Sequence, residues 1–316
     1  MIRGMRNTVS SKDKPLGLAA LAACALLWSM AGLFIKMVDW NPLAIAGARS
    51  AIAGLFLLIW IRKPKITFSL PQIGAALSSA ATMLLFVYAN KATTSANAIL
   101  LQYGAPIYTA ILGTVLLKER PRAEHIAAFA AVAGGMVLFF LGDLGGGSLL
   151  GNLAGVASGV TFAFYYVFLR MQKDGSPLES NLLAHLFTAA IALTASLFLP
   201  PPKITTGSVA AILVLGVFQV GLAAVFLSYG IKRVTAIQGI LIAALEPIAN
   251  PIWVFLATGE KPGANAIAGG LLIISAVIVS SIISLRRDAL AAERALSSGS
   301  GTPTIVNAPP RDQQNL

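Results

Sequence analysis

Charged residues are scarce in this sequence, since Asp, Glu, Lys and Arg make up only 11% of its 316 residues. It has one cysteine, Cys24, and two histidines, His125 and His185. A single cysteine excludes a disulfide within the chain, and two isolated histidines do not match the ligand spacing of a metal motif. No glycine-rich loop leads into Gly-Lys-Ser/Thr, and no Ser-His-Asp set lies at a plausible depth. We therefore expect no cofactor, no metal site and no catalytic residues.

Apolar residues dominate instead, at 57% of the chain, with a mean hydropathy of +0.80. They form ten runs, at 16–38, 42–61, 71–90, 95–117, 123–141, 149–171, 179–199, 207–231, 235–258 and 263–285. Each run approaches the ~20 residues that a helix needs to cross a bilayer. None alternates polar and apolar residues as the strands of a membrane barrel do. The pattern predicts an all-α polytopic membrane protein with ten transmembrane helices.

The chain repeats itself internally. Residues 88–128 reappear 141 positions later without a gap, and an earlier stretch repeats at an offset of 134. The predicted units are a first five-helix repeat at 16–144 and a second at 145–285. Because each holds an odd number of spans, the two repeats must insert with opposite orientations, an arrangement typical of secondary transporters.

The net charge of +11 is distributed asymmetrically along this topology. If the N-terminus is cytoplasmic, eighteen of the 23 lysines and arginines fall on the inner side and four on the outer side, while Arg49 lies within a span. This bias orients the protein and gives no reason to expect nucleic acid as a partner. It predicts two cytoplasmic ends, a tail at 1–15 and a tail at 286–316. The second begins with a short helix near Asp288 and is otherwise largely disordered.

Several motifs carry a resemblance to a known family. They are the span endings Glu119-Arg120-Pro121 and Glu260-Lys261-Pro262, the dipeptide Glu246-Pro247, Trp28, Pro42 followed by Arg49, and Tyr88, Lys91 and Thr94-Ser95-Ala96. Over about residues 16–285 the chain resembles the drug/metabolite transporter superfamily in its ten-helix form with two EamA-type repeats. The resemblance implies a bacterial inner-membrane carrier, closest in layout to amino-acid and metabolite exporters, including the aromatic amino-acid group. Trp28 departs from the membrane-embedded glutamate of the four-helix small multidrug exporters, which puts direct cation/proton antiport of their type in doubt.

Polar and aromatic side chains at membrane depth are the candidate substrate contacts, because they are costly in hydrocarbon and normally face a cavity or a partner. These cavity candidates are Trp28, Arg49, Asn97, Gln102, Tyr103, Tyr165, His185, Gln219 and Glu246. Arg49 and Glu246 lie at similar depths, so they either form an ion pair that locks the two halves together or contact the charged groups of a substrate. His185 either carries a proton or bonds to a neighbouring helix. Tyr165 either lines a cavity or packs.

Three prolines at membrane depth are predicted hinges: Pro106, Pro247 and Pro251. Each removes a backbone hydrogen bond from its helix, and Pro106 and Pro247 occupy equivalent positions in the two repeats.

The favoured function is a secondary carrier that exports amino acids and related small metabolites by alternating access. A multidrug or quaternary-ammonium exporter is the alternative within transport, and a non-transporting membrane protein is the alternative outside it. The expected partners are a small-molecule substrate and the lipid bilayer. The sequence does not determine the oligomeric state, and a monomer is compatible with it.

Overall fold

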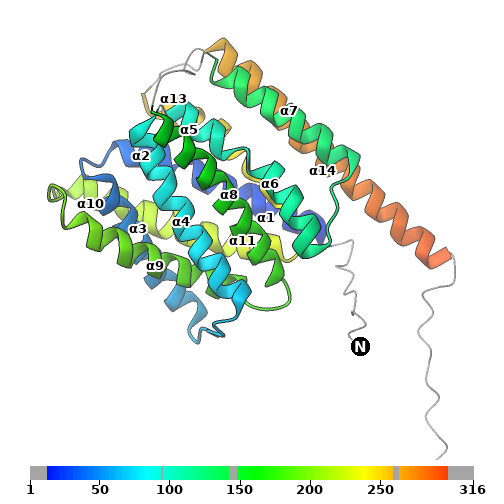
Figure 1. Cartoon of the computed structure of the whole chain (residues 1–316), viewed down its shortest axis with the longest axis horizontal. Coiled ribbons are helices and arrows are strands. Elements are labelled where there is room, and N and C mark those ends of the chain that lie inside the picture. Colours follow the sequence, from blue (N-terminus) through cyan, green and yellow to red (C-terminus); the bar gives the residue numbers. More distant parts are fainter. Residues whose placement is uncertain (1–12, 94, 142–147, 259–262, 298–316) are drawn as a thin grey trace, which may run out of the picture.

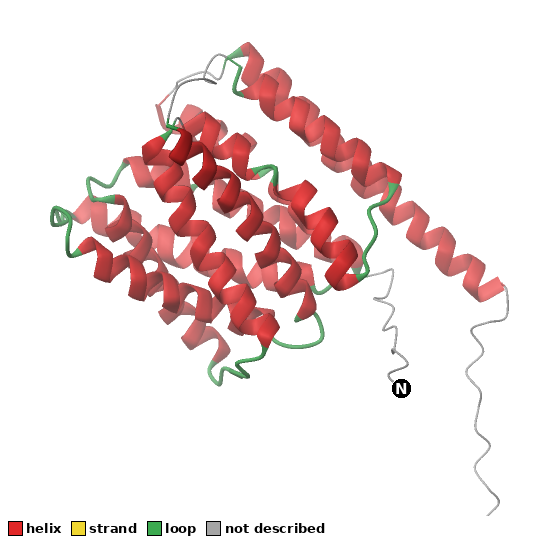
Figure 2. Ribbon diagram, in the orientation of Figure 1, coloured by secondary structure: helices red, strands yellow, loops and turns green. Residues whose placement is uncertain are grey.

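The computed structural model describes residues 13–93, 95–141, 148–258 and 263–297, and in these residues all regular structure is helical (Figure 2). The first half contains α1 (Lys14–Ser29), α2 (Ala31–Lys36), α3 (Pro42–Ile61), α4 (Leu70–Ala92), α5 (Ser95–Gln102), α6 (Ala105–Leu112), the π-helical segment η1 (Gly113–Leu117) and α7 (Ala123–Phe139). The second half contains α8 (Leu149–Met171), α9 (Pro177–Ser196), α10 (Thr206–Val214), the π-helical segment η2 (Leu215–Leu222), α11 (Ala223–Ile231), α12 (Ala236–Ala243), α13 (Glu246–Thr258) and α14 (Ala264–Ser297).

These helices coincide with the ten predicted spans. Among the described residues, eight helical stretches are long and apolar enough to cross a membrane, and 123–139 and 236–249 are shorter apolar helices at the other two positions. Large apolar side chains remain on the outside of the bundle, as on Leu55, Ile111 and Leu271, which are 60%, 59% and 61% exposed. A surface of this kind suits lipid rather than water. The prediction of an all-α polytopic membrane protein is confirmed.

The packing follows the inverted repeat. The α1 helix packs against α11 of the other half, and α4, the counterpart of α11, packs against α8, the counterpart of α1. The α3 helix packs against its own counterpart α9, and α7 packs against α14. Figure 1 shows α7 and α14 running side by side along one edge of the bundle. The main helix contacts therefore join one half to the other, and the core lies between the halves.

The first and last helices meet at one face of the bundle, which we call the terminal face. Lys14 at the start of α1 forms an ion pair with Asp288 near the end of α14. Arg122 also pairs with Asp288 at 2.9 Å, and Arg287 pairs with Glu124 at 2.8 Å. The short helix expected near Asp288 is the continuous end of α14, which reaches Ser297. The remainder of that tail lies outside the described residues.

Candidate functional site

In the described part of the chain, three of the ten spans are broken between their ends. The first is interrupted at Met30, the fourth at Tyr103 and Gly104, and the ninth at Ala244 and Leu245. Pro106 and Pro247 follow the last two breaks, in the first turn of α6 and α13. The breaks occur where the two prolines predicted them. Their action as hinges remains a prediction.

Each of these prolines frees a carbonyl group. A proline has no N–H to offer the carbonyl four residues earlier, so Gln102 and Ala243 lack their usual helical partners. Pro251, the third predicted hinge, lies inside α13 where the helix continues without a break.

The broken fourth and ninth spans meet through Tyr103. Its hydroxyl lies 3.1 Å from the freed carbonyl oxygen of Ala243 and 3.2 Å from Oε2 of Glu246. A phenol has a single proton, so Tyr103 donates to one of these two acceptors at a time. Glu246 is thus held at a helix break by a neutral group from the other half of the chain.

Arg49 is held in a similar way. Its Nη1 donates to Oε1 of Gln219 at 3.2 Å, and Nε2 of Gln219 donates to the carbonyl oxygen of Trp28 at 3.4 Å. Gln219 lies in η2, and π-helical turns are frequent at functional sites. Trp28 lies two residues before the break in the first span. Nε of Arg49 is buried and has no hydrogen-bond partner among the described residues.

Arg49 and Glu246 do not form the ion pair that their similar depths made possible. Each bonds to a neutral side chain, Gln219 in one case and Tyr103 in the other. Each still lies within range of the other's charge. The structure therefore places an arginine and a glutamate inside the bundle, each bonded to a neutral side chain and without direct contact between them.

The remaining candidates are distributed unevenly around Arg49 and Glu246. His185 is buried within range of the charge on Arg49, and its Nδ1 has no hydrogen-bond partner in the described part of the chain. Gln102 is partly exposed immediately before the break in the fourth span. His185 thus lies near Arg49, and Gln102 lies next to a helix break.

Two candidates lie apart from the charges. Tyr165 is buried in the core, and its hydroxyl donates to Oδ1 of Asn181. Asn97 lies in the first turn of α5 and donates to Oγ1 of Thr93 at 3.3 Å. It thus helps to order the start of α5, at the face opposite the terminal face.

Sequence reasoning missed an ion pair at the terminal face. Nε of Arg170 donates to Oε1 of Glu119 at 2.9 Å, and Nη1 of Arg170 donates to the carbonyl oxygens of Ile231 and Lys232, each at 2.9 Å. Oε2 of Glu119 accepts from the backbone N–H of Ala236, the first residue of α12, at 3.0 Å. We call this group the terminal latch. It joins the ends of the fourth and sixth spans to the turn before the ninth.

A signal for the latch was present in the repeat. Glu119 recurs as Glu260, and Arg170 matches the basic Lys36 at an offset of 134. Sequence spacing alone did not indicate that these two charges meet.

A second contact missed from the sequence involves Trp253. Its Nε1 donates to Oγ of Ser29 at 2.7 Å, which ties α13 to the break in the first span.

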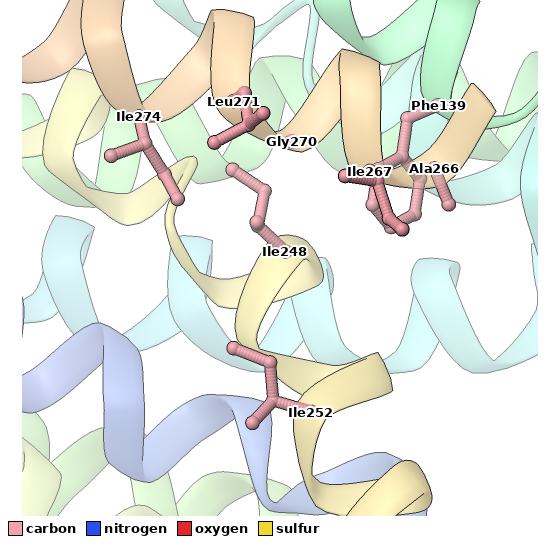
Figure 3. Close-up of a pocket in the computed structure, with 8 residues that line it drawn as sticks. All are labelled: Phe139, Ile248, Ile252, Ala266, Ile267, Gly270, Leu271 and Ile274. Atoms are coloured by element: carbon pink, nitrogen blue, oxygen red, sulfur yellow. The ribbon is translucent and has the colours of Figure 1, made fainter. Parts of the chain in front are cut away.

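The outer surface has a groove between α7, α13 and α14, shown in Figure 3. It is lined by Phe139, Ile248, Ile252, Ala266, Ile267, Gly270, Leu271 and Ile274. All of these residues are apolar, so the groove offers no group that orients a charged solute. The polar centre between the two halves is the better candidate site.

Comparisons with known proteins agree with this architecture. The sequence profile of the EamA-like transporter family matches residues 15–141 and again residues 149–282. An uncharacterized transporter of Archaeoglobus fulgidus is 25% identical over 274 residues, covering 81% of this chain and 94% of its own. The uncharacterized transporter YyaM of Bacillus subtilis is 28% identical over 207 residues, covering 62% of this chain and 68% of its own.

A solved crystal structure shares the fold, with a TM-score of 0.74 at 20% identity, over 86% of this chain and 99% of that one. The two family matches together span most of the sequence, and the structure places ten apolar helices across them. The chain therefore belongs to the EamA-like transporter family of the drug/metabolite transporter superfamily.

Proposed function

We propose that this transporter exports amino acids and related small metabolites across the bacterial inner membrane by alternating access. One observation carries the proposal. Arg49 from the first half and Glu246 from the second lie within apolar spans, interact electrostatically with each other, and are each bonded to a neutral side chain.

Isolated charges at this depth are costly unless a partner neutralises them. An amino acid at neutral pH is a zwitterion, so its carboxylate and ammonium groups suit Arg49 and Glu246 respectively. Binding would neutralise both charges without forcing the two side chains together. A direct ion pair between Arg49 and Glu246 would leave less reason for a zwitterion to bind.

The fold supports alternating access around this centre. The terminal latch closes one face, and the bias of lysine and arginine supports a cytoplasmic position for that face and for both termini. The breaks in the fourth and ninth spans supply repeat-related points at which the two halves can bend. Opening the latch while the opposite face closes would move a bound substrate between compartments.

Counterflow in proteoliposomes tests the proposal. Purified protein is preloaded with unlabelled threonine, methionine, phenylalanine or tryptophan, and uptake of the labelled amino acid is followed. Saturable uptake that the other amino acids compete for is expected. Absence of exchange by protein that is monodisperse and folded would remove amino acids as the substrate class.

Quaternary-ammonium export is the second candidate, and Glu246 is the observation that favours it. Among the described residues this carboxylate makes no ion pair, so it remains available to a cationic drug. The same vesicles are tested with labelled tetraethylammonium. Uptake of this cation without any amino-acid exchange would favour the second candidate over the first.

A further inference from the structure

We propose that the edge of the Arg49 guanidinium formed by Nε and Nη2, which makes no hydrogen bond in the described structure, is the subsite for the substrate carboxylate. Gln219 is the residue that positions this edge. This inference rests on the proposed function and assigns a polarity to the same site. The carboxylate binds at Arg49, and the ammonium group points toward Glu246 and Tyr103.

The hydrogen bonds of Arg49 leave one edge unused. A guanidinium has five N–H donors in a planar fork. The hydrogen bond to Gln219 is made by Nη1, while Nε is buried without a partner among the described residues. Nε and the neighbouring Nη2 together form a side-on edge that matches the two oxygens of a carboxylate.

The protein does not supply a carboxylate of its own to this edge in the described structure. Glu246 lies within range but is bonded to Tyr103. His185 also lies within range of Arg49, and its Nδ1 has no partner either. A buried donor without an acceptor is costly, and a bound carboxylate would remove that cost.

Gln219 fixes the direction of this edge. Its amide donates to the carbonyl oxygen of Trp28, which leaves its Oε1 facing Arg49. The π-helical segment η2 approaches α3 closely here. A Cβ added at Gly216 would lie 3.1 Å from the carbonyl oxygen of Arg49 and 2.5 Å from Cβ of Ile52, so a larger residue would not fit without a shift. Glycine at 216 thus allows Gln219 to reach the guanidinium.

A neutral amide at 219 is important for the proposed role. It holds Arg49 through one hydrogen bond without cancelling the positive charge, so the charge stays available to a ligand. A carboxylate at the same position would supply the counter-ion internally. Gln219→Glu is therefore the sharpest perturbation, since it keeps the size of the side chain and changes its charge.

The test compares charge-deleted analogues in counterflow. Labelled phenylalanine exchanges against excess unlabelled phenylalanine, phenylalanine methyl ester or phenethylamine, in wild-type protein, Gln219→Glu and Ser50→Ala. The ester and the amine keep the cationic group and lack the carboxylate. Ser50 is the matched control, because it neighbours Arg49 on α3 and its buried Oγ makes no hydrogen bond in the described structure.

In wild-type protein and Ser50→Ala, we expect both analogues to compete at least tenfold more weakly than phenylalanine. In Gln219→Glu we expect the affinity for phenylalanine to fall about tenfold and the preference over the ester to disappear. Equal competition by the methyl ester, phenethylamine and phenylalanine in wild-type protein would overturn the proposal of a carboxylate subsite, while the proposed carrier function would stand. Unchanged discrimination in folded Gln219→Glu would overturn the positioning role of Gln219. Absence of exchange for every amino acid in the wild type would instead overturn the proposed function.

Discussion

The terminal latch makes a quantitative prediction about which face of the transporter is open. In Arg170→Met, Glu119 keeps its bond to the Ala236 N–H but loses its cation, and the carbonyls of Ile231 and Lys232 lose their donor. The side chains of Arg170 and Glu119 are 9% and 18% exposed, so solvent compensates little. Removing one partner of a buried ion pair costs about 3–5 kcal/mol.

That cost falls on the closed state alone if the latch separates when the terminal face opens. Taking the lower value, about 3 kcal/mol, the population open at the terminal face should rise by on the order of 100-fold. Glu119→Gln keeps one acceptor oxygen, enough for one of the two donors, and Arg170 keeps its bonds to the carbonyl oxygens of Ile231 and Lys232. We therefore expect a smaller shift of about tenfold, from a loss of about 1.5 kcal/mol.

The rate at which Cys24 reacts with a thiol reagent can report this shift in population. Cys24 is the only cysteine, lies in α1 and is 1% exposed. In proteoliposomes, a membrane-impermeant maleimide added from the terminal-face side should label Cys24 faster in Arg170→Met than in Glu119→Gln, and slowest in wild-type protein.

Lys173→Met is the matched control for the latch. It removes a positive charge three residues from Arg170, and its side chain makes no hydrogen bond or ion pair in the described structure. If Cys24 were labelled at the same rate in folded Arg170→Met and folded Lys173→Met, the latch would not hold the terminal face closed.

Three further predictions concern the scaffold. Pro247→Ala restores an N–H that competes with Tyr103 for the Ala243 carbonyl, so the rate of counterflow should fall while the melting temperature stays the same. Pro71→Ala, in the first turn of α4, is the control and should leave counterflow unchanged. Gly269→Ala should cost about 1–3 kcal/mol in thermal unfolding, because its Cβ would lie 2.5 Å from the backbone of Gly135 and Phe139, whereas Gly134→Ala meets nothing within 4 Å and should be neutral. Asp288→Asn loses its ion pairs with Lys14 and Arg122 and should lower the free energy of unfolding by about 1 kcal/mol, a difference that shrinks in high salt. If Asp288→Asn impaired counterflow as strongly as Pro247→Ala, a purely structural role for Asp288 would be contradicted.

Local chemistry in the sequence determined much of the fold. The apolar runs gave the positions of the ten spans, because each span must satisfy its own backbone hydrogen bonds in lipid. The repeat indicated two related halves, and Pro106 and Pro247 marked two of the helix breaks, because a proline disrupts its helix whatever surrounds it. Belonging to the transporter family followed from the same local motifs.

Tertiary structure alone decided which side chains meet. Arg49 bonds to Gln219, 170 residues away, and Glu119 bonds to Arg170, 51 residues away. Tyr103 reaches Glu246 across the interface between the halves, while Tyr165 turns into the core. Depth in the membrane follows from position along a helix, which sequence gives. Partners depend on how each helix is rotated and on which neighbour it faces, and packing between the two halves sets both.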